Sequence, residues 1–162
     1  MNWFANYLST KKDIHVVKLD DENLLGKSYR VIKGTIRKNP DYDDAWLFAL
    51  SRESKIIFDI GCNIGQSSLL MFHDSDLQKM LLVDPNPIAL SQAAHNLIMN
   101  GFSAKACFVC TFVSDKPGEE LEFFTVGSGA AGSMYDSHAV TARKMKASFS
   151  VSTTTIDALV ED

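Results

Sequence analysis

Long hydrophobic runs and a secretory leader are both missing from this 162-residue chain. Met1 to Asp13 lacks the basic start and apolar stretch of a signal peptide, and no run approaches the length that crosses a membrane. Excess positive charge is missing too, since the net charge of -4 gives no general attraction to nucleic acid or anionic lipid. We therefore expect a cytoplasmic protein with neither nucleic acid nor membrane as a partner.

Cysteine is scarce, with three residues in the whole chain. An odd number without a disulfide pattern indicates reduced thiols, as in the cytoplasm. Cys107 and Cys110 have C-x-x-C spacing, but no second pair exists. Both fall within a predicted strand, where side chains three residues apart face opposite sides. We therefore predict no metal site.

One stretch of the chain organises the rest. Ile56 to Ile60 is a short apolar run with the length and branching of a buried strand. A glycine-bracketed loop from Gly61 to Gly65 follows, and Gln66 to Phe72 reads as the start of a helix. A strand, a glycine loop and a helix in this order predict a ligand-binding turn, because glycine lets backbone and ligand approach closely.

The loop differs from the turn that binds a dinucleotide. That turn needs glycine at its first, third and sixth positions, where this chain has Gly61, Asn63 and Gln66. Asp59, just before the loop, would repel a pyrophosphate and attract a cation. S-adenosylmethionine carries an ammonium and a sulfonium and no phosphate. The charge therefore favours S-adenosylmethionine and disfavours a nicotinamide-dependent oxidoreductase.

A second strand supports this interpretation. Met80 to Val83 is short and apolar, and Asp84 follows it about twenty residues beyond the glycine loop, where an acid commonly holds a ribose diol. The two oxygens of one carboxylate can accept both ribose hydroxyls at once. The order of Asp59, the two loop glycines and Asp84 predicts a nucleoside site.

Three segments in sequence resemble one family. Phe58 to Gly65, Val83 to Pro87 and Val113 to Gly118 are similar to the FkbM-type methyltransferases, and the resemblance runs from Ile56 to Val160. These are class I S-adenosylmethionine-dependent O-methyltransferases that act mostly on sugar and glycoside hydroxyls. The resemblance implies transfer of a methyl group to a small-molecule hydroxyl acceptor such as a sugar.

The resemblance also implies the roles of particular residues. Asp59 and the backbone of the glycine loop would hold the methionine end, Asp84 the ribose, and the region of Thr111 the adenine. Asp115 is interpreted as a turn residue. No catalytic base is assigned. The predicted cofactor-binding residues are Asp59, Gly61, Cys62, Asn63, Gly65, Gln66, Asp84, Pro85 and Thr111.

The implied fold is α/β. It is a Rossmann-like class I methyltransferase sheet with a 3-2-1 parallel core, antiparallel additions and helices on both faces. Residues 1–54 are predicted to form an N-terminal extension of short strands and a helix, and residues 55–162 the methyltransferase domain. The family continues after this point with an acidic Asp-x-Glu-Gly-x-Glu strand, which has no counterpart here. We therefore expect a domain incomplete at its C-terminus, an unpaired edge on the first strand, and a homodimer that covers this edge.

Several further elements are predicted from local patterns. Asn86 caps a helix that has Pro87 at its first position and ends at Gly101. Further strands are predicted at Ile14–Lys18, Tyr29–Ile36, Ala106–Val113, Leu121–Val126 and Phe149–Val151, with a turn at Asp20–Asn23. A helix is predicted to start at Asn39–Asp41, with Pro40 in its first turn, and its stripe is expected to cover the sheet: Tyr42, Ala45, Trp46, Ala49 and Leu50. Gly127–Ser133 is interpreted as a connector or lid, and a solvated loop is expected to hold Asp136, His138, Arg143, Lys144 and Lys146. A last helix is predicted to open at Thr154–Asp157.

Two classes of function remain open on these patterns. The first is the O-methyltransferase implied by the resemblance, working by in-line displacement helped mainly by positioning. The second is a non-catalytic or truncated binding or assembly module that keeps the methyltransferase fold. Calorimetry with S-adenosylhomocysteine and NADH, followed by a methyl-transfer assay, separates the two from each other and from an oxidoreductase.

Overall fold

The computed structural model describes residues 17–37, 39, 41–129 and 132–161. At its centre is a parallel sheet of β3 (Ile56–Ile60), β4 (Lys79–Val83) and β5 (Ala106–Val109), with β4 in the middle. Helix α3 (Gln66–Met71) follows β3, and α4 (Pro87–Met99) connects β4 to β5. The predicted α/β fold with parallel strands is confirmed, and the carboxyl ends of β3 and β4 meet at one edge.

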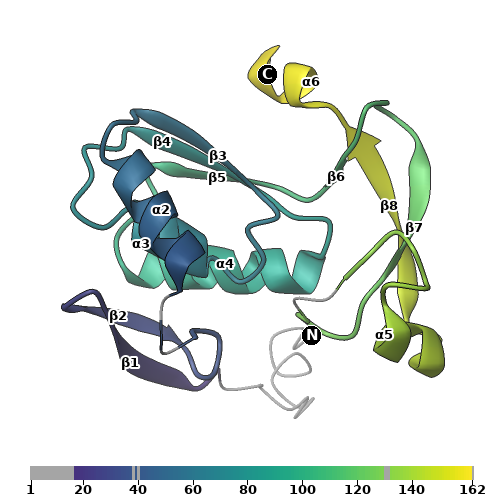
Figure 1. The fold of residues 1–162 in the computed structure, drawn as a ribbon, viewed down its shortest axis with the longest axis horizontal. Coiled ribbons are helices and arrows are strands. Elements are labelled where there is room, and N and C mark those ends of the chain that lie inside the picture. The colour runs from purple at the N-terminus through teal and green to yellow at the C-terminus, as the bar shows by residue number, and fades with distance from the viewer. Residues whose placement is uncertain (1–16, 38, 40, 130–131, 162) are drawn as a thin grey trace, which may run out of the picture.

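The main core lies between one face of this sheet and helices α3 and α4, which share that side (Figure 1). Met80 and Leu82 of β4 are fully buried there against Leu69 and Leu97. Helix α4 has the predicted bounds, because Asn86 caps it, proline occupies its first position and Gly101 follows its end with φ +82°.

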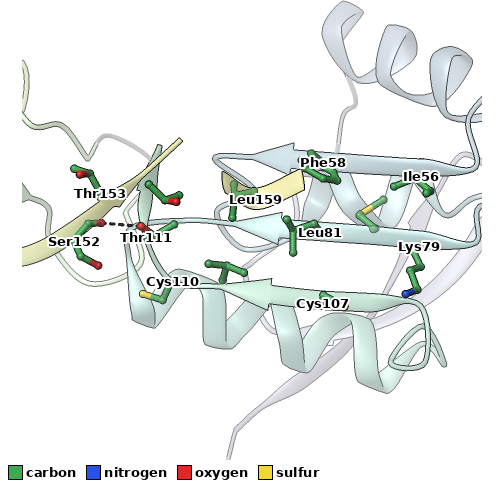
Figure 2. A pocket seen from close by; sticks show the side chains of 13 residues that line it. Ile56, Phe58, Lys79, Leu81, Cys107, Cys110, Thr111, Ser152, Thr153 and Leu159 are labelled. Carbon is green, nitrogen blue, oxygen red and sulfur yellow. Dashed lines mark hydrogen bonds between the residues drawn. The ribbon is translucent and has the colours of Figure 1, made fainter. Parts of the chain in front are cut away.

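The opposite face of the same sheet is largely open. Ile56 and Ile60 are 62% and 43% exposed, although β3 is apolar at four of its five positions. Helices were predicted on both faces. Among the described residues, the helix on this open face is α6 (Ile156–Glu161), whose Leu159 lies over the sheet (Figure 2). Helices therefore cover one face well and the other only at this point.

A second sheet is built from the C-terminal third of the chain. It contains β6 (Phe112–Val113), β8 (Ser148–Thr154) and β7 (Glu120–Phe124), with β6 parallel and β7 antiparallel to β8. The predicted single strand Ala106–Val113 was wrong, because the chain leaves the first sheet after Val109 and joins the second at Phe112. The expected loop beyond residue 135 also contains a helix, α5 (Val140–Met145).

Residues before β3 form an antiparallel hairpin and a helix. The hairpin consists of β1 (Leu19–Leu24) and β2 (Lys27–Ile32), so the predicted turn at Asp20–Asn23 was wrong. Those polar residues belong to a strand because every second side chain faces solvent, where Arg30 of β2 pairs with Asp21 at 3.0 Å. Most of the predicted strand Ile14–Lys18 lies outside the described residues. The hairpin packs on α4, whose Asn96 accepts a hydrogen bond from the Ile32 amide at 2.8 Å.

Helix α2 (Tyr42–Ser51) starts as predicted but buries a different face. Asp41 caps it, and the Asp44 carboxylate accepts a hydrogen bond from the Asp41 amide at 2.9 Å. The five stripe residues predicted to cover the sheet are all exposed, so that prediction was wrong. Arg37 binds the buried Asp44 at 2.5 Å, and Leu47 and Phe48, which follow Asp44 by three and four positions on the same side of the helix, are half-buried.

Candidate cofactor-binding site

A cavity of about 450 Å³ lies at the carboxyl ends of β3 and β4. This volume is within the range of small-molecule sites, and the position is where α/β sheets bind their ligands. Its lining combines the glycine loop, the turn after β4, the crossing into β6, and the far end of β7. The lining residues used below are Gly61, Asn63, Asp84, Pro85, Asn86, Thr111, Phe123, Gly129 and Gly132.

The glycine loop is held against the end of β4. The amides of Gly61 and Cys62 both donate to the Val83 carbonyl, at 2.8 and 3.2 Å. Gly65 has φ +82°, and a β-carbon there would lie 3.0 Å from the β-carbon of Ala93 on α4. Glycine is therefore required at Gly65 both for its backbone angle and for close packing on the helix.

Asp84 organises the cavity from the end of β4. Its side chain is almost fully buried, and its two oxygens accept hydrogen bonds from the amides of Asn63 and Asn86, each at 2.8 Å. Asn63 has φ +48°, so this bond stabilises a left-handed residue in the glycine loop. An ionised carboxylate has about four acceptor positions, so Asp84 retains capacity for two further donors such as a ribose diol.

Asp59 lies behind the loop, on the side of the helices. One of its oxygens accepts hydrogen bonds from the hydroxyls of Ser67 and Ser68 of α3, at 2.8 and 2.5 Å. Asp59 is not among the residues that line the cavity. Its carboxylate therefore fixes the start of α3, and any effect on a ligand acts through the electric field across the loop.

The charges around the cavity favour a cation. Asp84 is the only charged residue among the described residues that line it. Burial raises the pKa of Asp84. Burial also raises the pKa of Asp59, and the negative charge of the nearby Asp84 raises it further. The hydrogen-bond partners of both carboxylates are neutral hydroxyls and amides. A positive ligand would therefore stabilise both ionised acids, whereas a pyrophosphate would meet a negative field.

The remaining predicted residues fall into two groups. Pro85 and Thr111 line the cavity, and Thr111 donates its hydroxyl hydrogen to the Ser152 carbonyl at 2.8 Å, which ties the crossing strand to β8. Cys62 and Gln66 do not line it. Cys62 is buried, which raises the pKa of its thiol, and Gln66 accepts a hydrogen bond from the Arg37 amide at 2.6 Å.

The structure adds lining residues that the sequence patterns did not assign. Gly129 and Gly132 come from the segment interpreted as a connector or lid, and Phe123 comes from the end of β7. A side chain at Gly132 would overlap the Phe123 ring. The density of glycine between residues 127 and 132 was a usable signal, but only the turn of the chain at Thr111 brings this segment opposite Asp84.

A larger hollow of about 630 Å³ lies on the open face of the central sheet (Figure 2). Phe58, Leu81 and Leu159 give it an apolar lining, and Lys79 is its one charged residue among those described. Thr111 lies at the boundary of this hollow and the smaller cavity. The glycine loop and Asp84 are absent from its lining, so the smaller cavity is the candidate site for a cofactor.

Comparison with known proteins gives matches to solved structures alone. No family model matches the chain, and no curated protein matches it. TYW2 from P. horikoshii in complex with MeSAdo matches 62% of this chain and 39% of its own, at 16% identity and a TM-score of 0.48. Trm5 from Methanocaldococcus jannaschii in complex with adenosine matches 80% and 47%, at 14% identity and 0.43. A SAM-dependent methyltransferase from Agrobacterium tumefaciens matches 59% and 33%, at 16% identity and 0.43.

One of these three solved structures, that from Agrobacterium tumefaciens, is a methyltransferase by its name, and the present chain spans less than half of each. Because each of these TM-scores is below 0.5, we infer the ligand from the cavity of this chain and not from the ligands of those structures. Within the described ranges, no helix is long and apolar enough to span a bilayer, and no cluster of three His, Cys, Asp or Glu residues is placed to hold a metal.

Proposed function

We propose that the chain binds S-adenosylmethionine in the cavity at the ends of β3 and β4. The observation that carries this proposal is the single buried carboxylate, Asp84, in a lining that has no basic side chain among the described residues. Its free acceptor positions suit the ribose hydroxyls. The negative field of Asp84 and Asp59 suits the ammonium and sulfonium, and it disfavours the pyrophosphate of NAD.

The reaction that follows is transfer of the methyl group to a hydroxyl oxygen of a sugar or glycoside-type molecule, as the family resemblance implies. The acceptor oxygen would attack the methyl carbon in line with the breaking carbon–sulfur bond. S-adenosylhomocysteine would leave as a neutral thioether, and the hydroxyl proton would pass to a base or to water. The residues of this chain would supply cofactor orientation through Asp84 and the glycine loop.

The test is calorimetry with S-adenosylhomocysteine and NADH side by side. We expect S-adenosylhomocysteine to bind and NADH not to bind. Asp84→Ala should weaken binding by about 1.5–3 kcal/mol, the scale of a hydrogen bond to a charged group. The matched control is Asp115→Ala, an exposed acid in a turn, which should bind like the wild type. An unchanged dissociation constant in Asp84→Ala, or NADH as the preferred ligand, would overturn the proposal.

A radiolabelled methyl-transfer assay on a panel of simple glycosides then separates an enzyme from a binding module. Binding with turnover supports the sugar O-methyltransferase, and binding without turnover on any acceptor supports the non-catalytic alternative. The homodimer also stays a prediction. It is motivated by β3, which pairs with β4 along one edge and has no partner along the other among the described residues.

A further inference from the structure

Four hydrogen bonds of Asn86 lie beside the candidate site. It is only 2% exposed. Its side-chain oxygen accepts from the amides of Ile88 and Ala89, at 3.0 and 3.3 Å, and so caps α4. Its own amide donates to Asp84 at 2.8 Å. Its side-chain NH₂ group donates to the carbonyl of Gly127 at 2.7 Å, forty-one positions along the chain.

Gly127 begins the segment that forms the far wall of the cavity. We call this the glycine wall and define it by the described residues Gly127, Gly129, Gly132 and Ser133. Its far end is fixed to β7 by two hydrogen bonds between the backbones of Phe124 and Ser133, at 2.8 and 3.0 Å. Its near end has the Asn86 contact. Gly129 and Gly132 lie between these two anchors and line the cavity.

The described glycines of the wall pack closely on their neighbours. Gly132 lies so close to the Phe123 ring that a β-carbon would overlap it, and a β-carbon on Gly129 would lie 2.9 Å from the Val126 carbonyl. The wall therefore packs on β7 through Gly132, and one part-buried hydrogen bond from Asn86 to Gly127 joins it to the turn after β4. These two segments, as far as the structure describes them, are not paired as strands.

We propose that Asn86 is a positioning residue that sets the width of the cofactor cavity, by tying the glycine wall to the turn that carries Asp84. This rests on the proposed function. In the proposed function Asp84 binds the ribose, and Asn86 is hydrogen-bonded to Asp84. The part of the ligand between the turn and the wall would therefore be the adenosine. The tie should therefore affect adenosine and S-adenosylhomocysteine alike.

The test separates the two ends of the Asn86 side chain. Asn86→Asp and Asn86→Ser both keep an oxygen that caps α4, since Asp and Ser are good capping residues, and both remove the NH₂ donor to Gly127. The aspartate adds a charge and the serine does not. The matched control is Ser91→Ala, an exposed residue of α4 whose hydroxyl bonds only to the Ile88 carbonyl.

Two readouts are measured on each variant. Amide hydrogen exchange at Gly129 and Ser133 reports on the wall, and exchange at Leu90 reports on α4. We expect exchange at Gly129 and Ser133 to rise about tenfold in both Asn86 variants, with Leu90 unchanged. Calorimetry should show adenosine and S-adenosylhomocysteine weakened by the same factor, also about tenfold.

The outcomes are distinct. Unchanged exchange at the wall in both Asn86 variants would overturn the tie. Faster exchange with unchanged affinity would overturn its role in setting the cavity. If the wild type binds neither ligand, the proposed function fails, and the exchange measurement still decides whether Asn86 holds the wall.

Discussion

The two faces of the central sheet share the same strands and differ in what covers them. On the face toward α3 and α4, Met80 and Leu82 are almost wholly buried. On the other face, Leu81 is only half-buried and Ile56 is 62% exposed. Parallel strands are ordinarily buried on both faces. The contrast predicts that the stability of the described fold comes mainly from one side of the sheet, while the candidate cofactor cavity lies at the end of its strands.

The largest expected difference between the faces is in core stability. Leu82→Ala should lower the free energy of unfolding by about 2–5 kcal/mol, because it leaves a cavity among packed side chains. Its neighbour Leu81→Ala, on the open face, should cost about 1 kcal/mol or less. Urea denaturation of both variants checks this. Equal losses would mean that the open face is covered in solution, for example by a second copy of the chain.

A smaller effect is expected at the contact between the glycine loop and the covered side. Gly65→Ala combines a left-handed backbone with an overlap on Ala93, whereas Gly101→Ala has the same φ of +82° and open space around it. Both should lose about 1–2 kcal/mol for the backbone angle. Gly65→Ala should lose about 1–3 kcal/mol more from overpacking.

Thermal and urea unfolding of the two glycine variants measure this difference directly. The Gly101→Ala variant removes the cost of the backbone angle from the comparison. If both variants are destabilised equally, α4 moves away from the loop freely, and the close contact at Ala93 does not constrain the site.

The smallest effect is expected in the pH dependence of stability. Asp59 points to the covered side, where burial raises its pKa above the ordinary value of 3.8. Between 3.8 and the raised pKa the folded state binds more protons than the unfolded state, so this residue makes stability fall as pH rises through that window. Asp59→Asn keeps an acceptor for Ser67 and Ser68 and should gain stability relative to wild type as pH rises.

Urea denaturation between mildly acidic and neutral pH, on wild type and Asp59→Asn, measures this dependence. Asp115→Asn, an exposed acid, serves as the control and should follow the wild type. A wild-type profile parallel to that of Asp59→Asn would contradict this prediction. It would mean that the Asp59 carboxyl has the same pKa in the folded and unfolded chain, because water reaches it in the folded state.

Local patterns located the elements that hold the candidate site. Ile56 to Ile60 and the helix from Pro87 have the predicted bounds because strand branching, the Asn86 cap and the Gly101 stop act within a few residues. The same patterns failed for α2. Its apolar stripe is exposed, and the helix instead buries Asp44, which pairs with Arg37 outside the helix, a contact that the apolar periodicity does not contain.

The sequence by itself determined the strand, glycine loop and helix, and the acid after β4, because each depends on neighbours in the chain. Tertiary structure alone decided which acid faces the cavity. Asp59 and Asp84 both follow the apolar part of a strand, yet the hydroxyls of Ser67 and Ser68 on α3 bind the first, and the second reaches the glycine loop. It also decided that the chain crosses between sheets at Thr111, because a contact with Ser152, far along the chain, fixes that crossing and brings the glycine wall opposite Asp84.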